Sequence, residues 1–152
     1  MKSEIATFFE AFPSGTVWAN TVQGQGYDLV LLGQAGPTRI DVDMMQERLS
    51  SPEYAAVAQS LREIGFFSAG DLLATFAGEA SDLKTWLKDA AINRDRNLRL
   101  QYLAGMGLNL YQANAIYTSM VAYGIRFPQN LFSGSEALMQ SLRQAIESGQ
   151  GR

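Results

Sequence analysis

An uninterrupted apolar segment, Leu29 to Leu32, constrains the fold of this chain more than any other feature. It follows the linker Gln23 to Gly26, which is typical of a hairpin because glycine tolerates positive φ. A strand on a half-exposed sheet alternates apolar and polar residues, whereas a continuous apolar run indicates burial on both faces. A lone two-stranded hairpin is marginal in water. We therefore expect further strands from a preceding part of a longer protein or from a second copy. The alternative interpretation is one turn of buried helix.

The first part of the chain, residues 1–36, is predicted to be a helix followed by this hairpin. The helix is expected from Glu4 to Phe12, with Ser3 as its cap, and Pro13-Ser14-Gly15 ends it. The strands are predicted at Thr16 to Val22 and Tyr27 to Leu32, where β-branched and aromatic residues are enriched.

Residues 37–152 are predicted to form a five- or six-helix region. The expected helices run from Asp41 or Asp43 to Leu49, and then approximately over 52–64, 69–78, 82–90, 109–123 and 135–146, with serines at several starts. The fold class expected is therefore α+β and mostly helical. No internal repeat of fixed period supports a helical repeat array.

Composition excludes several classes of function. The chain has no histidine and no cysteine, so a Ser-His-Asp triad, a cysteine nucleophile and a thiolate metal site are impossible. The net charge of -3 offers no basic field for nucleic acid. No apolar run reaches the roughly 18 residues of a membrane-spanning helix. We expect a cytoplasmic chain that does not insert directly into a membrane.

The densest polar cluster in the sequence comprises Asn93, Arg94, Asp95, Arg96 and Arg99. Arginines in such a cluster bind phosphate or carboxylate groups bidentately. The alternative interpretation is a solvated loop whose Asn and Asp side chains bond the backbone.

Three acidic residues, Asp41, Asp43 and Glu47, are close enough in sequence to suggest a metal site. Helix capping explains the two aspartates without a metal. We therefore expect no metal here.

Several segments resemble the end of a known family. Residues 12–18, from Phe12 to Trp18, and 26–33, from Gly26 to Gly33, are similar to the last strand pair of spermidine synthase-like proteins, and the likeness continues through Pro37 to Asp41. Residues 89–105 resemble a segment of the long bacterial variants, in which a membrane-spanning region precedes the synthase domain. The chain departs from that pattern at Arg94, where threonine is usual.

The resemblance implies a methyltransferase-type sheet that ends in this hairpin, and, in the intact protein, aminopropyl transfer from decarboxylated S-adenosylmethionine to a diamine. The nucleotide-binding loop and the acidic residues of that family lie upstream, so no catalytic residue and no cofactor are expected in this chain. The resemblance makes Trp18, Tyr27 and Asp28 candidates for lining a polyamine groove. The alternative is that both rings are core and that Asp28 faces solvent or holds a turn.

Two hypotheses of function follow from the sequence. In the first, the chain is the C-terminal module of a spermidine synthase-like enzyme, which completes the sheet and one wall of a substrate groove; its partners are the rest of that protein and, at the groove, a polyamine. The resemblance to the long variants implies a parent protein with a membrane anchor. In the second, the chain is a stand-alone interaction or dimerisation domain. We expect it either to self-associate or to expose an apolar surface beside the hairpin from Trp18 to Leu32.

Overall fold

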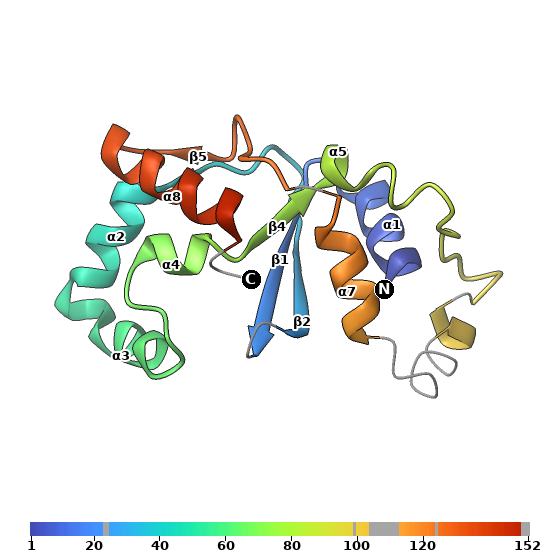
Figure 1. The fold of residues 1–152 in the computed structure, drawn as a ribbon, viewed down its shortest axis with the longest axis horizontal. Helices are drawn as coiled ribbons and strands as arrows, with labels where there is room; N and C mark the ends of the chain where they lie inside the picture. The colour runs from blue at the N-terminus through green and yellow to red at the C-terminus, as the bar shows by residue number, and fades with distance from the viewer. Residues whose placement is uncertain (23–24, 99, 104–112, 124, 150–152) are drawn as a thin grey trace.

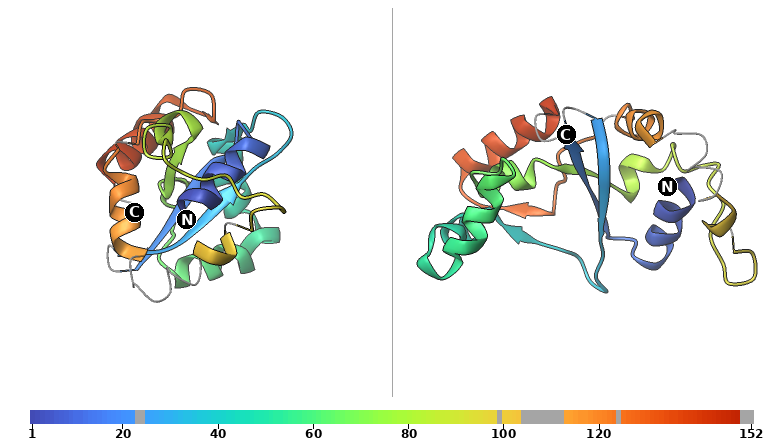
Figure 2. Two further views of the ribbon diagram at one scale, coloured as in Figure 1. Left: turned by 90° about the vertical axis from the view of Figure 1, so that its right-hand side faces the viewer. Right: turned by 90° about the horizontal axis from the view of Figure 1, so that it is seen from below.

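The computed structural model describes residues 1–22, 25–98, 100–103, 113–123 and 125–149. It is an α+β mixture, about 50% helical, with a small antiparallel sheet, as the sequence predicts at this level. Figure 1 shows the sheet in the middle of the molecule, with α1, α5 and α7 on one side and α2, α3, α4 and α8 on the other. The further views in Figure 2 show the same division.

The predicted hairpin is the central element of the fold. Strand β1 (Thr16–Val22) pairs antiparallel with β2 (Gln25–Leu32), with Val17 opposite Leu31 and Trp18 opposite Val30. The register shifts between Asn20 and Thr21, which marks a bulge. Linker residues 23–24 lie outside the described residues.

A third strand completes this sheet, and the sequence prediction missed it. Strand β4 (Phe76–Glu79) pairs antiparallel with β1, so the strand order is β2-β1-β4. The expected helix from Ala69 to about Gly78 is therefore wrong beyond its first turns: α4 (Ala69–Leu73) is short and the chain then turns into the sheet. Gly78, near the end of this strand, has a φ of +128°, a backbone angle that residues with a side chain rarely adopt, so glycine suits the position.

One face of the sheet packs against the N-terminal helix and its neighbours. Helix α1 (Lys2–Ala11), α5 (Ala80–Leu83) and α7 (Ala113–Val121) cover this face. The resulting first core cluster consists of the buried residues Ile5, Phe9, Val17, Ala19, Ala77, Leu83, Trp86, Tyr117 and Met120, with Leu29 and Leu31 packed against it. Strand residues of alternate positions thus point to one side, as a pleated strand requires.

Two glycines allow α1 to approach the hairpin closely. A Cβ atom at Gly15 would lie 2.5 Å from the ring of Phe8, and one at Gly33 would lie 2.6 Å from the ring of Phe12. Both contacts are shorter than real Cβ atoms show. The glycines that flank the two strands therefore leave the space that these aromatic rings fill.

The opposite face of the sheet carries a second core cluster. Its buried residues are Val42, Leu73, Ala74, Phe76, Phe127, Leu131, Phe132, Leu142 and Ile146, and Trp18 packs against them. The elements that supply it are α2 (Val42–Ser50), α4, α8 (Glu136–Ser148) and a small parallel pair of β3 (Ile40–Asp41) and β5 (Phe132–Ser133). These short strands also went unpredicted, so residues 37–152 are not purely helical.

The helix starts show which predicted caps form. Asp41 caps α2, because its Oδ1 accepts a hydrogen bond of 2.9 Å from the backbone N–H of Met44. Asp43 instead joins two helices: its carboxylate accepts hydrogen bonds from the backbone N–H and the hydroxyl of Ser135, just before α8. Ser3 is not a cap, since α1 already begins at Lys2 and Ser3 is buried inside it.

The middle helices follow the prediction less closely. A short 3-10 turn, η1 (Pro52–Tyr54), precedes α3 (Ala55–Glu63), where one helix was expected. Ser68 caps α4 by accepting from the backbone N–H of Asp71 at 3.0 Å. The helix expected over 82–90 is wrong: α5 ends at Leu83, and turns follow. Part of the helix expected over 109–123 lies outside the described residues.

Within the residues described, no helix is long and apolar enough to cross a membrane.

Candidate functional site

Trp18 packs against the second core cluster and also lines an apolar groove beside the hairpin. Its ring lies 5.6 Å from that of Phe76 and 6.2 Å from that of Phe132, both edge-on. Its indole Nε1–H donates to the hydroxyl of Thr16 at 2.8 Å. The polar atom of the ring is therefore already satisfied within the protein, and the indole offers an apolar surface to any ligand.

The other two candidates from the resemblance lie on β2. The backbone of Tyr27 belongs to this strand, while its side chain lies outside the described residues. Asp28 is exposed, sits opposite Asn20, and accepts a hydrogen bond from the backbone N–H of Leu29 at 2.8 Å. Trp18 pairs with Val30, two positions along the strand from Asp28. Asp28 and Trp18 thus lie on neighbouring strands of one hairpin, and Asn20, the partner of Asp28, lines the same groove as Trp18.

The polar cluster predicted around Asn93 forms an irregular loop. The side-chain oxygen of Asn93 accepts a hydrogen bond from the backbone N–H of Leu100 at 2.9 Å. The backbone N–H of Asn93 donates a hydrogen bond to the hydroxyl of Thr7 in α1. Asp95 and Arg96 are exposed, and Arg99 lies outside the described residues. Arg94, another member of the predicted cluster, forms an ion pair with Glu10. The loop is thereby fastened to α1.

An apolar groove lies beside the hairpin, and the sequence predicted an apolar surface there. The groove measures about 460 Å³ and is lined by Trp18, Ala19, Asn20, Val30, Leu32, Ile40, Met45, Phe66, Leu72, Leu73 and Thr75. Val30 is 54% exposed and Leu32 is 45% exposed. The expectation that the apolar run is buried on both faces is therefore wrong for this chain by itself: Leu29 and Leu31 pack against the core, and the alternate residues do not.

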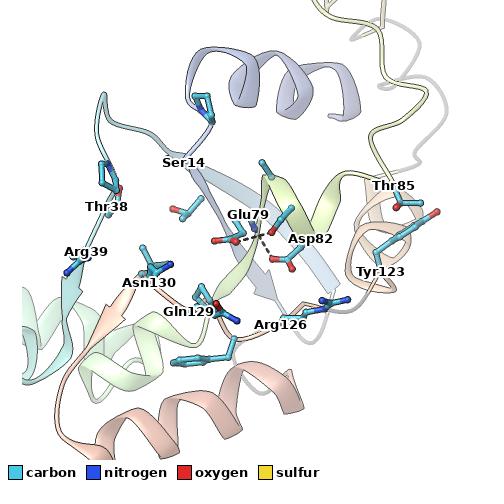
Figure 3. Close-up of a pocket in the computed structure, with 18 residues that line it drawn as sticks. Ser14, Thr38, Arg39, Glu79, Asp82, Thr85, Tyr123, Arg126, Gln129 and Asn130 are labelled. Atoms are coloured by element: carbon cyan, nitrogen blue, oxygen red, sulfur yellow. Dashed lines mark hydrogen bonds between the residues drawn. The ribbon is translucent and has the colours of Figure 1, made fainter.

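A larger, polar cleft lies where several loops meet, at the end of the sheet where β1 begins and β4 ends. It measures about 1030 Å³, and Figure 3 shows its lining residues. Its charged side chains are Arg39 before β3, Glu79 and Asp82 around the start of α5, and Arg126 after α7. Sequence analysis missed this cleft. Its residues come from four separate parts of the chain and share no motif, so only the fold brings them together.

Electrostatics in this cleft centre on Asp82. Partial burial raises the pKa of the Asp82 carboxyl, and the nearby Glu79 carboxylate acts in the same direction. Two groups oppose this shift in pKa: the backbone N–H of Glu79, which donates to Asp82 Oδ2 at 3.1 Å, and the Arg126 guanidinium. Burial is the largest effect, so the ionised carboxylate is held at a cost in free energy.

No metal centre is found within the described residues, where no group of three or more His, Cys, Asp or Glu side chains converges. Of the three acidic residues considered from sequence, Asp41 caps α2 and Asp43 bonds to Ser135. Glu47 is exposed on α2.

Comparison of this chain with protein-family models, curated proteins and solved structures gave no match.

Proposed function

We propose that this chain is the C-terminal module of a spermidine synthase-like aminopropyltransferase of polyamine biosynthesis. In this proposal it completes a methyltransferase-type sheet and forms one wall of the substrate groove, and it is not catalytic alone. One observation carries the proposal: β2 combines an unpaired outer edge with an apolar groove on one face.

The open edge is defined by the strand order. Strand β1 is paired on both sides, by β2 and by β4, so among the described residues β2 has no strand on its outer side. The backbone N–H and C=O groups of such an edge are a template for another strand. A further strand placed there would extend the sheet from three strands to four.

A strand that pairs with this edge would also cover the apolar side chains of the adjacent groove. Val30 and Leu32 are 54% and 45% exposed, and they share the groove with Trp18, Ile40 and Met45. An extended segment is the partner that both pairs with the edge and covers the adjacent apolar side chains. In a synthase-like protein this segment is a strand of the nucleotide-binding sheet, which also brings the donor-binding loop next to the hairpin.

The role in the substrate groove is assigned to Trp18, Tyr27 and Asp28. Asp28 is exposed and forms no ion pair in the described part of the chain, so its carboxylate is available to an ammonium group. Trp18 presents an apolar ring surface, which suits methylene stems.

The experiment starts from the native reading frame. A glycine-rich nucleotide-binding segment encoded upstream supports the proposal, and a frame without one overturns it. That upstream segment is then co-expressed with this chain. We expect a complex that the double change Val30→Thr and Leu32→Thr breaks and that Val57→Thr leaves intact. Val57 is also an exposed valine, at 50%, but lies on α3 outside the groove.

The alternative function, a dimerisation domain, is favoured by the same edge. An antiparallel strand edge is self-complementary, so two copies related by a two-fold axis would join as one larger sheet. Light scattering at micromolar concentration separates the two functions. A stable dimer that Val30→Thr and Leu32→Thr dissociates, in a protein with no upstream synthase segment, would establish the alternative.

A further inference from the structure

The polar cleft contains four charged side chains that the protein leaves without an ion pair. In the described part of the chain, Arg39, Glu79, Asp82 and Arg126 take part in no salt bridge. Charged side chains elsewhere do pair: Lys2 donates to Asp89 at 2.9 Å. Unpaired charges gathered in a cleft, in a chain with only 18% charged residues, indicate a ligand of matching charge.

The hydrogen bonds of these groups leave most of their capacity unused. The Arg39 and Arg126 guanidinium groups each carry five N–H donors, and no hydrogen bond from either to the described residues is found. Glu79 Oε1 accepts from the Ser81 hydroxyl at 2.9 Å, and Asp82 Oδ2 accepts from the backbone of Glu79. The Glu79 side chain also accepts a hydrogen bond from the backbone N–H of Asp82. An ionised carboxylate has about four lone-pair sites, so both side chains keep acceptor capacity for a ligand.

The placement of the charges shows what kind of ligand fits. Figure 3 shows the carboxylates of Glu79 and Asp82 beside each other, with Arg39 on one side and Arg126 on the other. Beside Arg39, the hydroxyl oxygen of Thr38 is buried and has no hydrogen-bond partner in the described part of the chain. The cleft therefore offers an anionic centre and two cationic flanks, with a buried hydroxyl group beside one of them.

We propose that this cleft binds a small zwitterion. The ammonium group of the ligand contacts Glu79 and Asp82, and its carboxylate contacts Arg39, in the charge-assisted hydrogen bonds that such pairs form. A diamine would place its second cation against an arginine, and a dicarboxylate would place an anion against Glu79 or Asp82, so each leaves a like-charge contact. The volume of about 1030 Å³ admits a ligand larger than a single small amino acid.

This inference is independent of the proposed function. The cleft and the apolar groove have no lining residue in common. The reading frame and the complex with an upstream segment test the proposed function, and neither involves the cleft. A failure of one proposal therefore leaves the other standing.

The test uses four probes, three with a four-carbon chain and one with a six-carbon chain, together with the full 152-residue chain. The zwitterions 4-aminobutyrate and 6-aminohexanoate are titrated in parallel with 1,4-diaminobutane and succinate, and binding is followed by NMR shifts of backbone amides. We expect a zwitterion to shift amides at 79–82 and 38–39, with an affinity at least about tenfold above both the diamine and the diacid, a difference of about 1.4 kcal/mol. Equal or tighter binding of the diamine or of succinate overturns the proposal, as does the absence of cleft shifts with either zwitterion.

Matched variants assign the binding to the cleft. Arg39→Gln and Glu79→Gln each remove one charge and are expected to weaken zwitterion binding about tenfold or more. Arg62→Gln and Glu63→Gln make the same changes on α3, outside the cleft, and should leave the affinity unchanged. If Glu79→Gln unfolds, the result for Arg39→Gln decides alone, since Arg39 is exposed and has no ion pair among the described residues. Equal effects in cleft and control variants contradict the proposal.

Discussion

Two adjacent leucines on β2 provide a sharp test of which face of the hairpin is covered. Leu31 packs against the first core cluster, whereas Leu32 points to the apolar groove and is 45% exposed. Replacing each in turn by aspartate places the same charge one residue apart on the same strand. The two variants therefore differ only in the face of the sheet that receives the carboxylate.

The magnitudes follow from burial. Complete burial of a leucine side chain stabilises a fold by about 1.5–3 kcal/mol, so Leu32→Asp, at a half-exposed position, should cost about 1 kcal/mol. Leu31→Asp loses more apolar contact and also leaves an unpaired carboxylate against apolar side chains, which adds several kcal/mol. We expect a loss of about 4 kcal/mol or more, a large share of a total stability of roughly 5–15 kcal/mol.

Urea unfolding followed by tryptophan fluorescence measures this difference. Trp86 is 2% exposed and Trp18 is partly buried, so both report the loss of the fold. With a slope of about 2 kcal/mol/M, the midpoint should fall by about 2 M for Leu31→Asp and about 0.5 M for Leu32→Asp. Equal shifts in the two variants, or an unchanged midpoint for Leu31→Asp, would show that the assignment of the two faces is wrong.

Three further predictions concern the carboxylates and the activity. Because burial raises the pKa of Asp82, the folded state binds protons more readily there, and stability falls as pH rises above about 4. The melting temperature of Asp82→Asn, relative to that of the native chain, should therefore increase from acid to neutral pH. Asp89→Asn should show the opposite trend, because the hydrogen bond from Lys2 lowers the pKa of Asp89 in the folded chain. A difference in melting temperature that does not change with pH would contradict the prediction for Asp82. Asp43→Ala should cost about 1–2 kcal/mol in thermal unfolding, because the N–H and hydroxyl of Ser135 lose their acceptor, and a loss below about 0.3 kcal/mol would argue against that link. This chain alone should show no turnover of decarboxylated S-adenosylmethionine with putrescine, and measurable product would refute its assignment as a non-catalytic module.

The hairpin was predictable because its signals are local. Strand β1 has the predicted bounds, Thr16–Val22, and β2 ends at Leu32 as predicted. A continuous apolar run, β-branched residues and a glycine linker all lie within about twenty residues of each other, so a sequence window contains the whole pattern. The cap at Asp41 was predictable for the same reason.

Strand β4 was not predictable in this way. Phe76–Glu79 continues an apolar pattern that begins in α4, and on its own it reads as helix. It forms a strand because it pairs with the edge of β1 and because the ring of Phe76 packs against the rings of Trp18 and Phe132, with centroids 5.6 and 6.0 Å away. Such tertiary contacts override local propensity, and the polar cleft depends on them as well, since Glu79 ends this strand.

The position of β4 in the chain has a consequence for the order in which the protein forms. The contact between Val17 and Gly78 joins residues about 60 positions apart, whereas β1 and β2 meet within one short turn, and hairpins close in about 1–10 μs. During synthesis at about 5–20 residues per second, β1 waits roughly 3–12 s for β4 to emerge. Throughout that interval the edge of β1 that β4 later fills is open. At this stage the chain is most exposed to pairing of that edge with a wrong strand.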